Sequence, residues 1–251
     1  MPDPKRFVLV HGALHGAWCW LKVIPFLEKM GHSALAVDLP GRQGKGQPGW
    51  GLTLEDYIDD LTGTVEREQG QVVLVGHSLG GMAISGVAER LPHRIERLVY
   101  VTAWVSMQGQ SLAQLHKSNA GSLVASATRL SLIRGQVTAR PRGYREVFCA
   151  DCSDEDFAWA HGQLVPESTR PALGGVQLTK SRFGSVPSSY LRCSDDRALT
   201  LAQQQRMLES IGCRHVITLP SSHSPFLSMP GRLAEALDES ARQPVSTAVC
   251  A

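Results

Sequence analysis

One serine stands in a glycine-rich stretch that would favour its use as a nucleophile. The segment from Leu74 to Ala83 reads LVGHSLGGMA, follows the apolar run QVVLV and precedes the helix-compatible run MAISGVAERL. It contains the pattern G-x-S-x-G from Gly76 to Gly80. Between a strand and a helix, this pattern forms a sharp turn that lifts the Ser78 hydroxyl above the carboxyl edge of a sheet, beside helix N–H groups that stabilise an oxyanion. The pattern predicts a nucleophilic serine. The alternative is a Gly-rich turn with an incidental serine.

A nucleophilic serine needs a histidine as its base. In a strand–turn–helix architecture of this kind the chain order is serine, acid, histidine. His223, in LPSSHSPFLSMP, follows the last predicted strand through a loop and is the predicted base. His215 opens that strand and is expected to pack at its edge. His15 and His77 are expected to be structural neighbours that do not carry the proton.

The orienting acid is expected just after the strand PSSYLRC. The sequence Ser194-Asp195-Asp196-Arg197 offers two aspartates at that point. One of them is expected to cap or solvate the turn while the other reaches His223; a solvated turn without a catalytic acid is the alternative. The preceding strand ends in YVTAW, which carries no carboxylate, so the other position for the acid is empty.

The loop after the first strand is expected to complete an oxyanion hole. It reads HGALHGAW from His11 to Trp18. His11 and Gly12 would bring the backbone close to the serine, and the N–H of Ala13 would act together with that of Leu79. A simple turn of small residues is the alternative.

The elements that must position these residues alternate along the chain. Short apolar or β-branched runs predict strands that are covered on both faces, and helical patterns lie between them. Thr53-x-x-Asp56 predicts a helix start, and Gly31, Gly70 and Gly212 predict helix ends. This alternation predicts an α/β fold with a mostly parallel, doubly wound sheet. The predicted strands are residues 6–10, 34–38, 71–75, 97–102, 187–193 and 215–219.

Residues 105–186 interrupt the alternation, and we call them the inserted segment. They contain no convincing strand but several helical stretches, including GSLVASATRLSL and SDEDFAWAHGQLV. A stretch of this length is too long for an ordinary connection. We therefore expect a helical cap at 105–186 and a core made of residues 1–104 and 187–251. The tail RQPVSTAVCA is expected to be unstructured.

Composition excludes several classes of function. The chain has 251 residues with a net charge of +2, and no Lys/Arg cluster resembles a nucleic-acid surface. The first apolar run stops at His11-Gly12, which is too short for a signal peptide or a membrane span. We expect a cytoplasmic protein with no nucleic-acid or membrane partner. A homodimer stays open.

Six cysteines are scattered without the spacing of a disulfide framework. Cys149 and Cys152 form a C-x-x-C, which would suit a redox pair or half of a zinc site. No second C-x-x-C exists, and the acidic residues that follow oppose a low thiol pKa. We therefore expect reduced thiols near a helix start.

The chain resembles the α/β-hydrolase fold, and within it the small esterases and hydroxynitrile lyases that include plant methylesterases and bacterial pyrethroid-type esterases. FVLVHGALHGAWCW, VVLVGHSLGG, CSDDRAL and SSHSPFLSMP carry the resemblance, which runs from Phe7 to about Leu237. DCSDEDFAWAHGQLVPES is similar to part of a cap domain. The resemblance implies that Ser78 is the nucleophile and His223 the base. It selects Asp196 as the acid because the family's acid directly precedes a charged residue in this loop.

The same resemblance distinguishes two kinds of chemistry. Lyases of the group carry a threonine after the first-strand histidine and a lysine after the catalytic histidine, where this chain has Gly12 and Ser224. The resemblance therefore implies ester hydrolysis through an acyl-enzyme, without a metal or organic cofactor. Gly12, Leu14 and Trp104 are predicted to contact the substrate, with Trp104 at the pocket entrance.

A small, mostly apolar ester is the expected substrate, because the inserted segment supplies apolar residues and few clustered charges. Two other functions stay open. One is a non-hydrolytic enzyme on the same fold, such as a lyase or cyclase of a biosynthetic pathway. The other is a small-molecule-binding protein built on a hydrolase scaffold.

Overall fold

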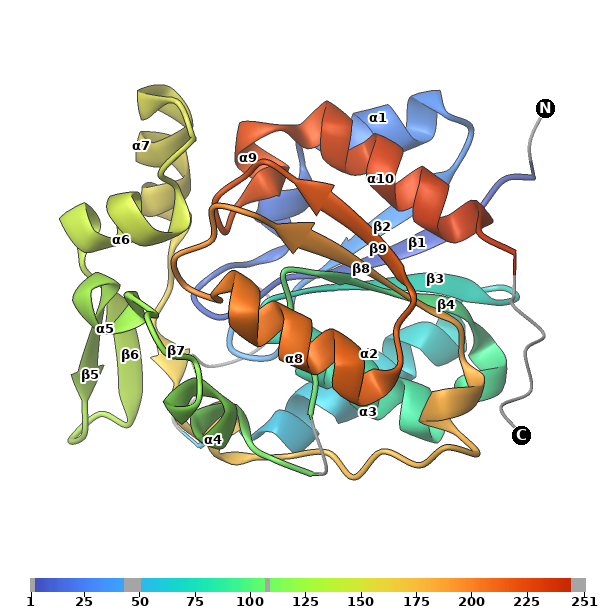
Figure 1. The fold of residues 1–251 in the computed structure, drawn as a ribbon, viewed down its shortest axis with the longest axis horizontal. Helices are drawn as coiled ribbons and strands as arrows, with labels where there is room; N and C mark the ends of the chain where they lie inside the picture. Colours follow the sequence, from blue (N-terminus) through green and yellow to red (C-terminus); the bar gives the residue numbers. More distant parts are fainter. Residues whose placement is uncertain (1–2, 43–50, 107–108, 245–251) are drawn as a thin grey trace.

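Six parallel strands form the central sheet of the computed structural model, which describes residues 3–42, 51–106 and 109–244 (Figure 1). Their order across the sheet is β2-β1-β3-β4-β8-β9. Each predicted strand is present, with ends shifted by two residues at most. The strands are β1 (Arg6–Val10), β2 (Ser33–Val37), β3 (Val72–His77), β4 (Ile95–Val101), β8 (Ser188–Cys193) and β9 (His215–Leu219).

Side chains on alternate positions of the inner strands enter two separate cores, one on each face of the sheet. In β3, for example, Val72 and Leu74 enter one core, while Val73 and Val75 enter the other. All four are fully buried, which explains the continuous apolar run in the sequence. Helices α2 (Leu54–Arg67), α3 (Gly80–Arg90) and α8 (Leu201–Ile211) cover one face, and α1 (Ile24–Lys29), α9 (Pro225–Ser228) and α10 (Pro230–Arg242) cover the other (Figure 1).

The ends of the helices follow the local sequence. Thr53 caps α2 in a capping box with Asp56, and α8 ends at Gly212, whose φ of +63° is left-handed. The single helix expected before Gly31 is instead two pieces, a 3-10 turn η1 (Ala17–Trp20) and α1. Pro25 explains the break, because it lacks an N–H and fits only the first turn of a helix. A further 3-10 turn, η2 (Pro92–Arg94), precedes β4.

Strand register brings the functional loops together at one edge. Val10 at the end of β1 pairs with Gly76 in β3, and Val101 at the end of β4 pairs with His77. The carboxyl ends of neighbouring strands are therefore level. The loops that follow β1, β3, β4, β8 and β9 emerge side by side, although they are far apart in the sequence.

Residues 124–168 of the inserted segment lie beyond this carboxyl edge, on the left of Figure 1, while its last residues run back along α3 to the start of β8. The inserted segment is not wholly helical, so the expectation of a segment without strands was wrong. It contains a three-stranded antiparallel sheet made of β5 (Thr128–Ser131), β6 (Gln136–Ala139) and β7 (Glu167–Ser168). The stretch GSLVASATRLSL forms only one helical turn, at α5 (Val124–Ala127), before it becomes a strand. The remaining elements are α4 (Leu112–Lys117), α6 (Pro141–Phe148), α7 (Asp154–Gln163), η3 (Arg170–Leu173) and η4 (Phe183–Ser185).

Two expectations from the sequence concern the C-terminal tail and a possible membrane-spanning helix. Most of the tail that we expected to be unstructured lies outside the described residues, and its first residue, Arg242, ends α10. Within the described residues, no helix is both long and apolar enough to cross a membrane.

Candidate active site

Ser78 occupies a strained turn between β3 and α3. Its φ of +50° is a left-handed conformation that non-glycine residues rarely adopt. The glycines on either side have negative φ, and they serve to allow close approach. A Cβ at Gly76 would lie 2.9 Å from the Gly80 carbonyl, and a Cβ at Gly80 would lie 2.6 Å from the His11 carbonyl oxygen. The serine therefore carries the strain, and the glycines give the turn room.

Two further glycines hold neighbouring backbone against this turn. A Cβ at Gly81 would lie 2.4 Å from the Trp104 carbonyl oxygen, so this glycine lets α3 pack against the chain that leaves β4. A Cβ at Gly12 would lie 2.7 Å from the Cβ of Ser78. Gly12 thus packs against the serine and does not line the cavity described below.

His223 and Asp196 form a buried pair at the ends of β9 and β8. Asp196 Oδ2 accepts a hydrogen bond from His223 Nδ1 at 2.6 Å. Because a carboxylate only accepts, Nδ1 carries the proton, and in the neutral form of the imidazole Nε2 is a lone-pair acceptor. Asp195 is exposed, so the structure places only the second of the two aspartates against the histidine.

Asp196 is itself held from several sides. Its Oδ1 accepts hydrogen bonds from the backbone N–H groups of Ala198 (2.7 Å) and Leu199 (2.9 Å). The hydroxyl of Thr102, at the end of β4, donates to Oδ2. Sequence reasoning missed Thr102, because it considered only whether the end of this strand carried a carboxylate.

Three other histidines surround the serine but are held neutral. Burial lowers the pKa of His11 and His77 well below the usual value, and it lowers the pKa of His15 to about 3. His77 Nε2 donates to the carbonyl of His223 at 2.9 Å, so it supports the loop that carries His223. These contacts fit the expectation that His15 and His77 are structural neighbours.

Ala13 and Leu79, whose backbone N–H groups were predicted for the oxyanion hole, line the same cavity as Ser78. Neither the Ala13 N–H nor the Leu79 N–H has an acceptor among the described residues. Leu79 stands at the start of α3, where the helix dipole adds partial positive charge. Unsatisfied donors that face a cavity are available to a ligand oxygen.

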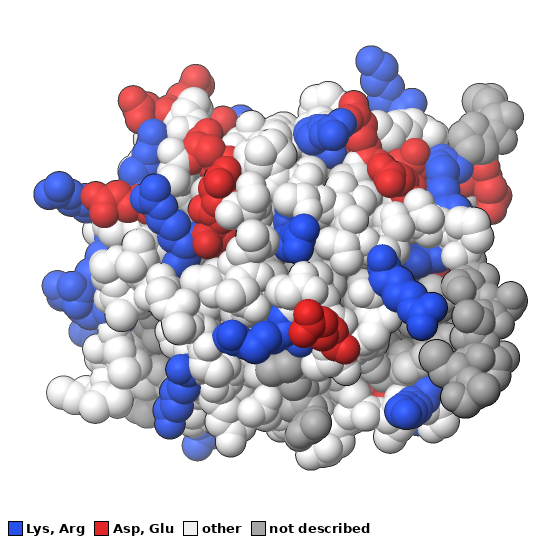
Figure 2. All heavy atoms as spheres, in the orientation of Figure 1, with Lys and Arg blue, Asp and Glu red and all other residues white. Residues whose placement is uncertain are grey.

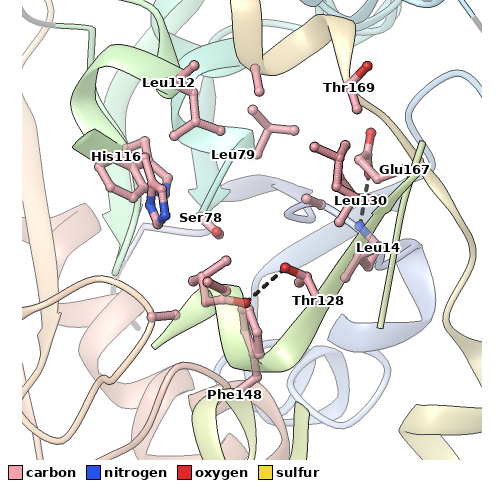
Figure 3. Close-up of a pocket in the computed structure, with 18 of the residues that line it drawn as sticks. Leu14, Ser78, Leu79, Leu112, His116, Thr128, Leu130, Phe148, Glu167 and Thr169 are labelled. Atoms are coloured by element: carbon pink, nitrogen blue, oxygen red, sulfur yellow. Dashed lines mark hydrogen bonds between the residues drawn. The ribbon is translucent and has the colours of Figure 1, made fainter. Parts of the chain in front are cut away.

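A cavity of about 710 Å³ opens above the serine. Figure 3 shows the Ser78 hydroxyl pointing into a space bounded by Leu79, His116 and Thr128. The hydroxyl makes no hydrogen bond to another described residue. The wall is mainly apolar and comes largely from the inserted segment. Its apolar members include Leu14, Leu79, Trp104, Leu112, Val124, Leu130, Val137, Phe148 and Leu173.

Leu14 and Trp104, which were predicted to contact the substrate, both lie in this wall, but Trp104 is not at the pocket entrance. It is only 5% exposed, and its ring meets that of His116 edge to face at 6.2 Å. His116, on α4, was not predicted. Burial lowers its pKa, so a neutral imidazole faces the cavity.

Glu167 connects the inserted segment to the loop that follows β1. From β7, its Oε2 accepts a hydrogen bond from the Leu14 N–H at 2.9 Å and also pairs with the Arg42 guanidinium, while the Tyr57 hydroxyl donates to Oε1. Arg42 Nε donates in turn to the carbonyl of His15. Leu14 has a φ of +67°, so this contact holds a strained residue beside Ala13. No sequence pattern indicated these partners.

The C-x-x-C motif forms no disulfide. Cys149 follows the end of α6, whereas Cys152 directly precedes Ser153, the N-cap of α7, so only Cys152 lies at a helix start as expected. Hydrogen bonding to Cys149, together with burial, raises the pKa of Cys152. A raised pKa opposes thiolate chemistry.

Comparison with known proteins places the chain in a family. A model of the alpha/beta hydrolase family matches residues 7–236. A pyrethroid hydrolase of Sphingobium wenxiniae is 32% identical over 94% of this chain and 88% of its own length. Methyl jasmonate esterase 1 of Vitis vinifera is 30% identical, with 94% of this chain and 96% of its own length covered.

The fold agrees with this match. The crystal structure of polyneuridine aldehyde esterase superposes with a TM-score of 0.84 at 27% identity, covering 94% of this chain and 99% of that one. Both the fold class and the resemblance seen in the sequence are thereby confirmed. The chain belongs to the alpha/beta hydrolase family.

Proposed function

We propose that the protein is a serine carboxylesterase that uses Ser78, His223 and Asp196. The observation that carries the proposal is the buried Asp196–His223 pair, at 2.6 Å, beside a cavity into which a strained serine points. The relatives support it, because those compared above are named as a hydrolase or as esterases.

The reaction follows from the protonation states in the site. His223 Nε2 accepts the proton of Ser78 as the serine oxygen attacks the ester carbonyl carbon. The carbonyl oxygen becomes an oxyanion, which accepts hydrogen bonds from the Ala13 and Leu79 N–H groups. Asp196 keeps the Nδ1 proton in place and stabilises the imidazolium that forms.

The second half of the reaction reverses these roles. The imidazolium protonates the oxygen of the leaving alcohol, the C–O bond breaks, and an acyl-serine remains. Water then gives a proton to Nε2 and attacks the acyl carbon. Collapse of this second intermediate returns the proton to Ser78 and releases the carboxylic acid.

The cavity favours an apolar ester of moderate size. Its volume of about 710 Å³ lies within the usual range for small-molecule sites, and leucine and alanine are the most frequent residues of its mainly apolar wall. The inserted segment provides much of that wall, so we propose that residues 105–186 act as the lid of the site. Free thiols at the described cysteines support a reducing compartment, consistent with a cytoplasmic location.

Hydrolysis is favoured over the lyase alternative by the residue that follows the base. Ser224 is buried beside the Cys149 thiol, and the described residues of the cavity wall include no lysine. Among the described residues of this wall, no ammonium group is therefore available to stabilise a departing cyanide.

A fluorophosphonate probe tests the proposal directly. Wild-type protein should be labelled at Ser78 and should hydrolyse p-nitrophenyl esters, whereas Ser78→Ala should lose both labelling and turnover. Failure of the probe to label Ser78 in folded protein would overturn the assignment. Turnover retained by Ser78→Ala would do the same.

A further inference from the structure

The hairpin formed by β5 and β6 presents large apolar side chains to solvent. Leu132 and Ile133, in the turn between these strands, are 85% and 94% exposed, more than any other large apolar residue among those described. Exposed apolar side chains that gather at one tip indicate a surface that is covered during function. We call residues 128–139 the hairpin.

The hairpin stands beside the opening of the cavity. Leu130 in the hairpin and Leu173 in η3 both line the cavity, yet they are 57% and 67% exposed. Residues that line a cavity and remain this exposed lie at its mouth. Figure 1 shows the hairpin projecting away from the central sheet, and uncharged atoms form the corresponding corner of Figure 2.

Positive charge surrounds this apolar tip. Residues 118–145 contain five arginines and no aspartate or glutamate. Arg142 and Arg145 form ion pairs with acidic residues of α6 and α7. Among the described residues, the exposed side chains of Arg129, Arg134 and Arg140 have no ion pair.

We propose that the hairpin docks this protein on an anionic lipid surface. Leu132 and Ile133 enter the boundary between headgroups and acyl chains, and the neighbouring arginines meet the lipid phosphates. The mouth of the cavity then faces the phase in which apolar esters dissolve. A second copy of the chain fits this surface less well, because pairing two tips would bring arginines against arginines.

The proposed contact is peripheral. It needs no membrane-spanning helix and agrees with the lack of one among the described residues. The sequence led us to expect no membrane partner because it has no long apolar run. The proposal limits that expectation to membrane-spanning contacts. Two apolar side chains in a four-residue turn leave no such run in the sequence.

Co-sedimentation with lipid vesicles tests the proposal and does not depend on hydrolysis. Full-length wild-type protein and the Leu132→Ser/Ile133→Ser variant would be mixed with vesicles of phosphatidylcholine alone or with about 30% phosphatidylserine. We expect wild type to bind the anionic vesicles, and the variant to bind them at least about tenfold more weakly. Arg134→Gln should weaken binding by about fivefold, and added salt should weaken it further.

Two matched controls address nonspecific effects. Leu21 is also exposed but lies outside the inserted segment, so Leu21→Ser should bind vesicles like wild type. Arg232 lies on α10, so Arg232→Gln removes the same charge as Arg134→Gln from another surface and should also leave binding unchanged. Hydrolysis of a short, water-soluble ester should be equal in wild type and in the Leu132→Ser/Ile133→Ser variant, which shows that this variant is folded.

Three results would overturn the proposal. The first is wild-type protein that binds neither kind of vesicle. The second is vesicle binding that is unchanged in the hairpin variant. The third is a wild-type protein that does not bind vesicles but forms a dimer in analytical ultracentrifugation, while the hairpin variant is a monomer. That result would show that the tip contacts a second copy of the chain. Ser78→Ala should still bind vesicles, so a failure of the esterase proposal would be distinguishable.

Discussion

Replacement of Glu167 should separate its two roles, as a counter-ion for Arg42 and as an acceptor for the Leu14 N–H. The carboxylate is buried and makes both contacts through the same oxygen. Removing one partner of a buried ion pair costs about 3–5 kcal/mol, and an unsatisfied buried N–H costs a further 1–3 kcal/mol. Glu167→Leu should therefore lower the free energy of unfolding by about 4–8 kcal/mol. Glu167→Gln keeps a neutral acceptor for the Leu14 N–H, so only the ion-pair cost applies, and the free energy of unfolding should fall by about 3 kcal/mol.

The double variant Arg42→Met/Glu167→Leu distinguishes the two roles. It removes both charges, so most of the ion-pair penalty should disappear, and stability should return to within about 2 kcal/mol of wild type. The Leu14 N–H still lacks its acceptor in this variant. Because Leu14 is strained at a φ of +67° and follows Ala13, the loop should relax and misplace one oxyanion donor. Loss of such a donor lowers kcat by about 10²–10³-fold, which sets the upper limit of the effect.

Urea unfolding and steady-state kinetics on a soluble p-nitrophenyl ester measure these quantities. We expect the stable double variant to have a kcat reduced at least about tenfold with little change in KM, because the lost interaction forms only in the transition state. Glu167→Gln should keep most of its kcat despite its lower stability. A double variant with wild-type kcat would refute the reasoning and leave Glu167 as a counter-ion only.

Three further predictions use matched positions. Gly81→Ala should destabilise the protein by about 1–3 kcal/mol because its Cβ would meet the Trp104 carbonyl. Gly162→Ala, with nothing within 4 Å of the added Cβ, should stabilise α7 by about 0.5–1 kcal/mol. Thermal melts compare the two variants, and equal effects on stability would contradict the packing argument. Asp196→Asn should lower kcat by about 10³–10⁴-fold while the exposed Asp195→Asn leaves it unchanged, and equal kcat values would remove Asp196 from the mechanism. His15 has a pKa of about 3 when folded and an ordinary value of 6.5, so only the unfolded state takes up its proton between these values. The free energy of unfolding should therefore fall by about 2 kcal/mol for this group from pH 7 to pH 5, and His15→Asn should remove that part of the decrease in urea titrations.

The central sheet could be predicted because its strands are determined by local sequence. A strand such as β3 is buried on both faces, so its first four positions are all apolar, and the run VVLV is visible without knowledge of its partners. The turn at Ser78 is also visible in the local sequence as G-x-S-x-G, although only Gly76 is needed by a contact within the turn, while Gly80 makes room for the His11 carbonyl beyond β1. Signals in the local sequence explain why the strands and the turn at Ser78 could be predicted.

The hairpin could not be predicted for the opposite reason. β5 and β6 have four residues each, and none of their residues is fully buried, so the sequence shows neither an apolar run nor a clear alternation. Their pairing depends on the turn at Gly135, whose φ is +56°, and on β7, which lies about 30 residues later. A helical pattern over ASATRLSL was therefore as consistent with the sequence as the strand that forms.

The contacts around Asp196 show why a position should not be dismissed because it lacks the expected residue type. The end of β4 was correctly described as lacking a carboxylate, and that absence directed attention to the two later aspartates. Yet the position is not idle, because Thr102 donates its hydroxyl to Asp196 from there, with a φ of +36° that few threonines adopt. A β-branched residue is held in such a conformation only where its surroundings enforce it. The strain at Ser78, Leu14 and Thr102 therefore converges on one edge of the sheet, where three separate loops are fixed around a single cavity.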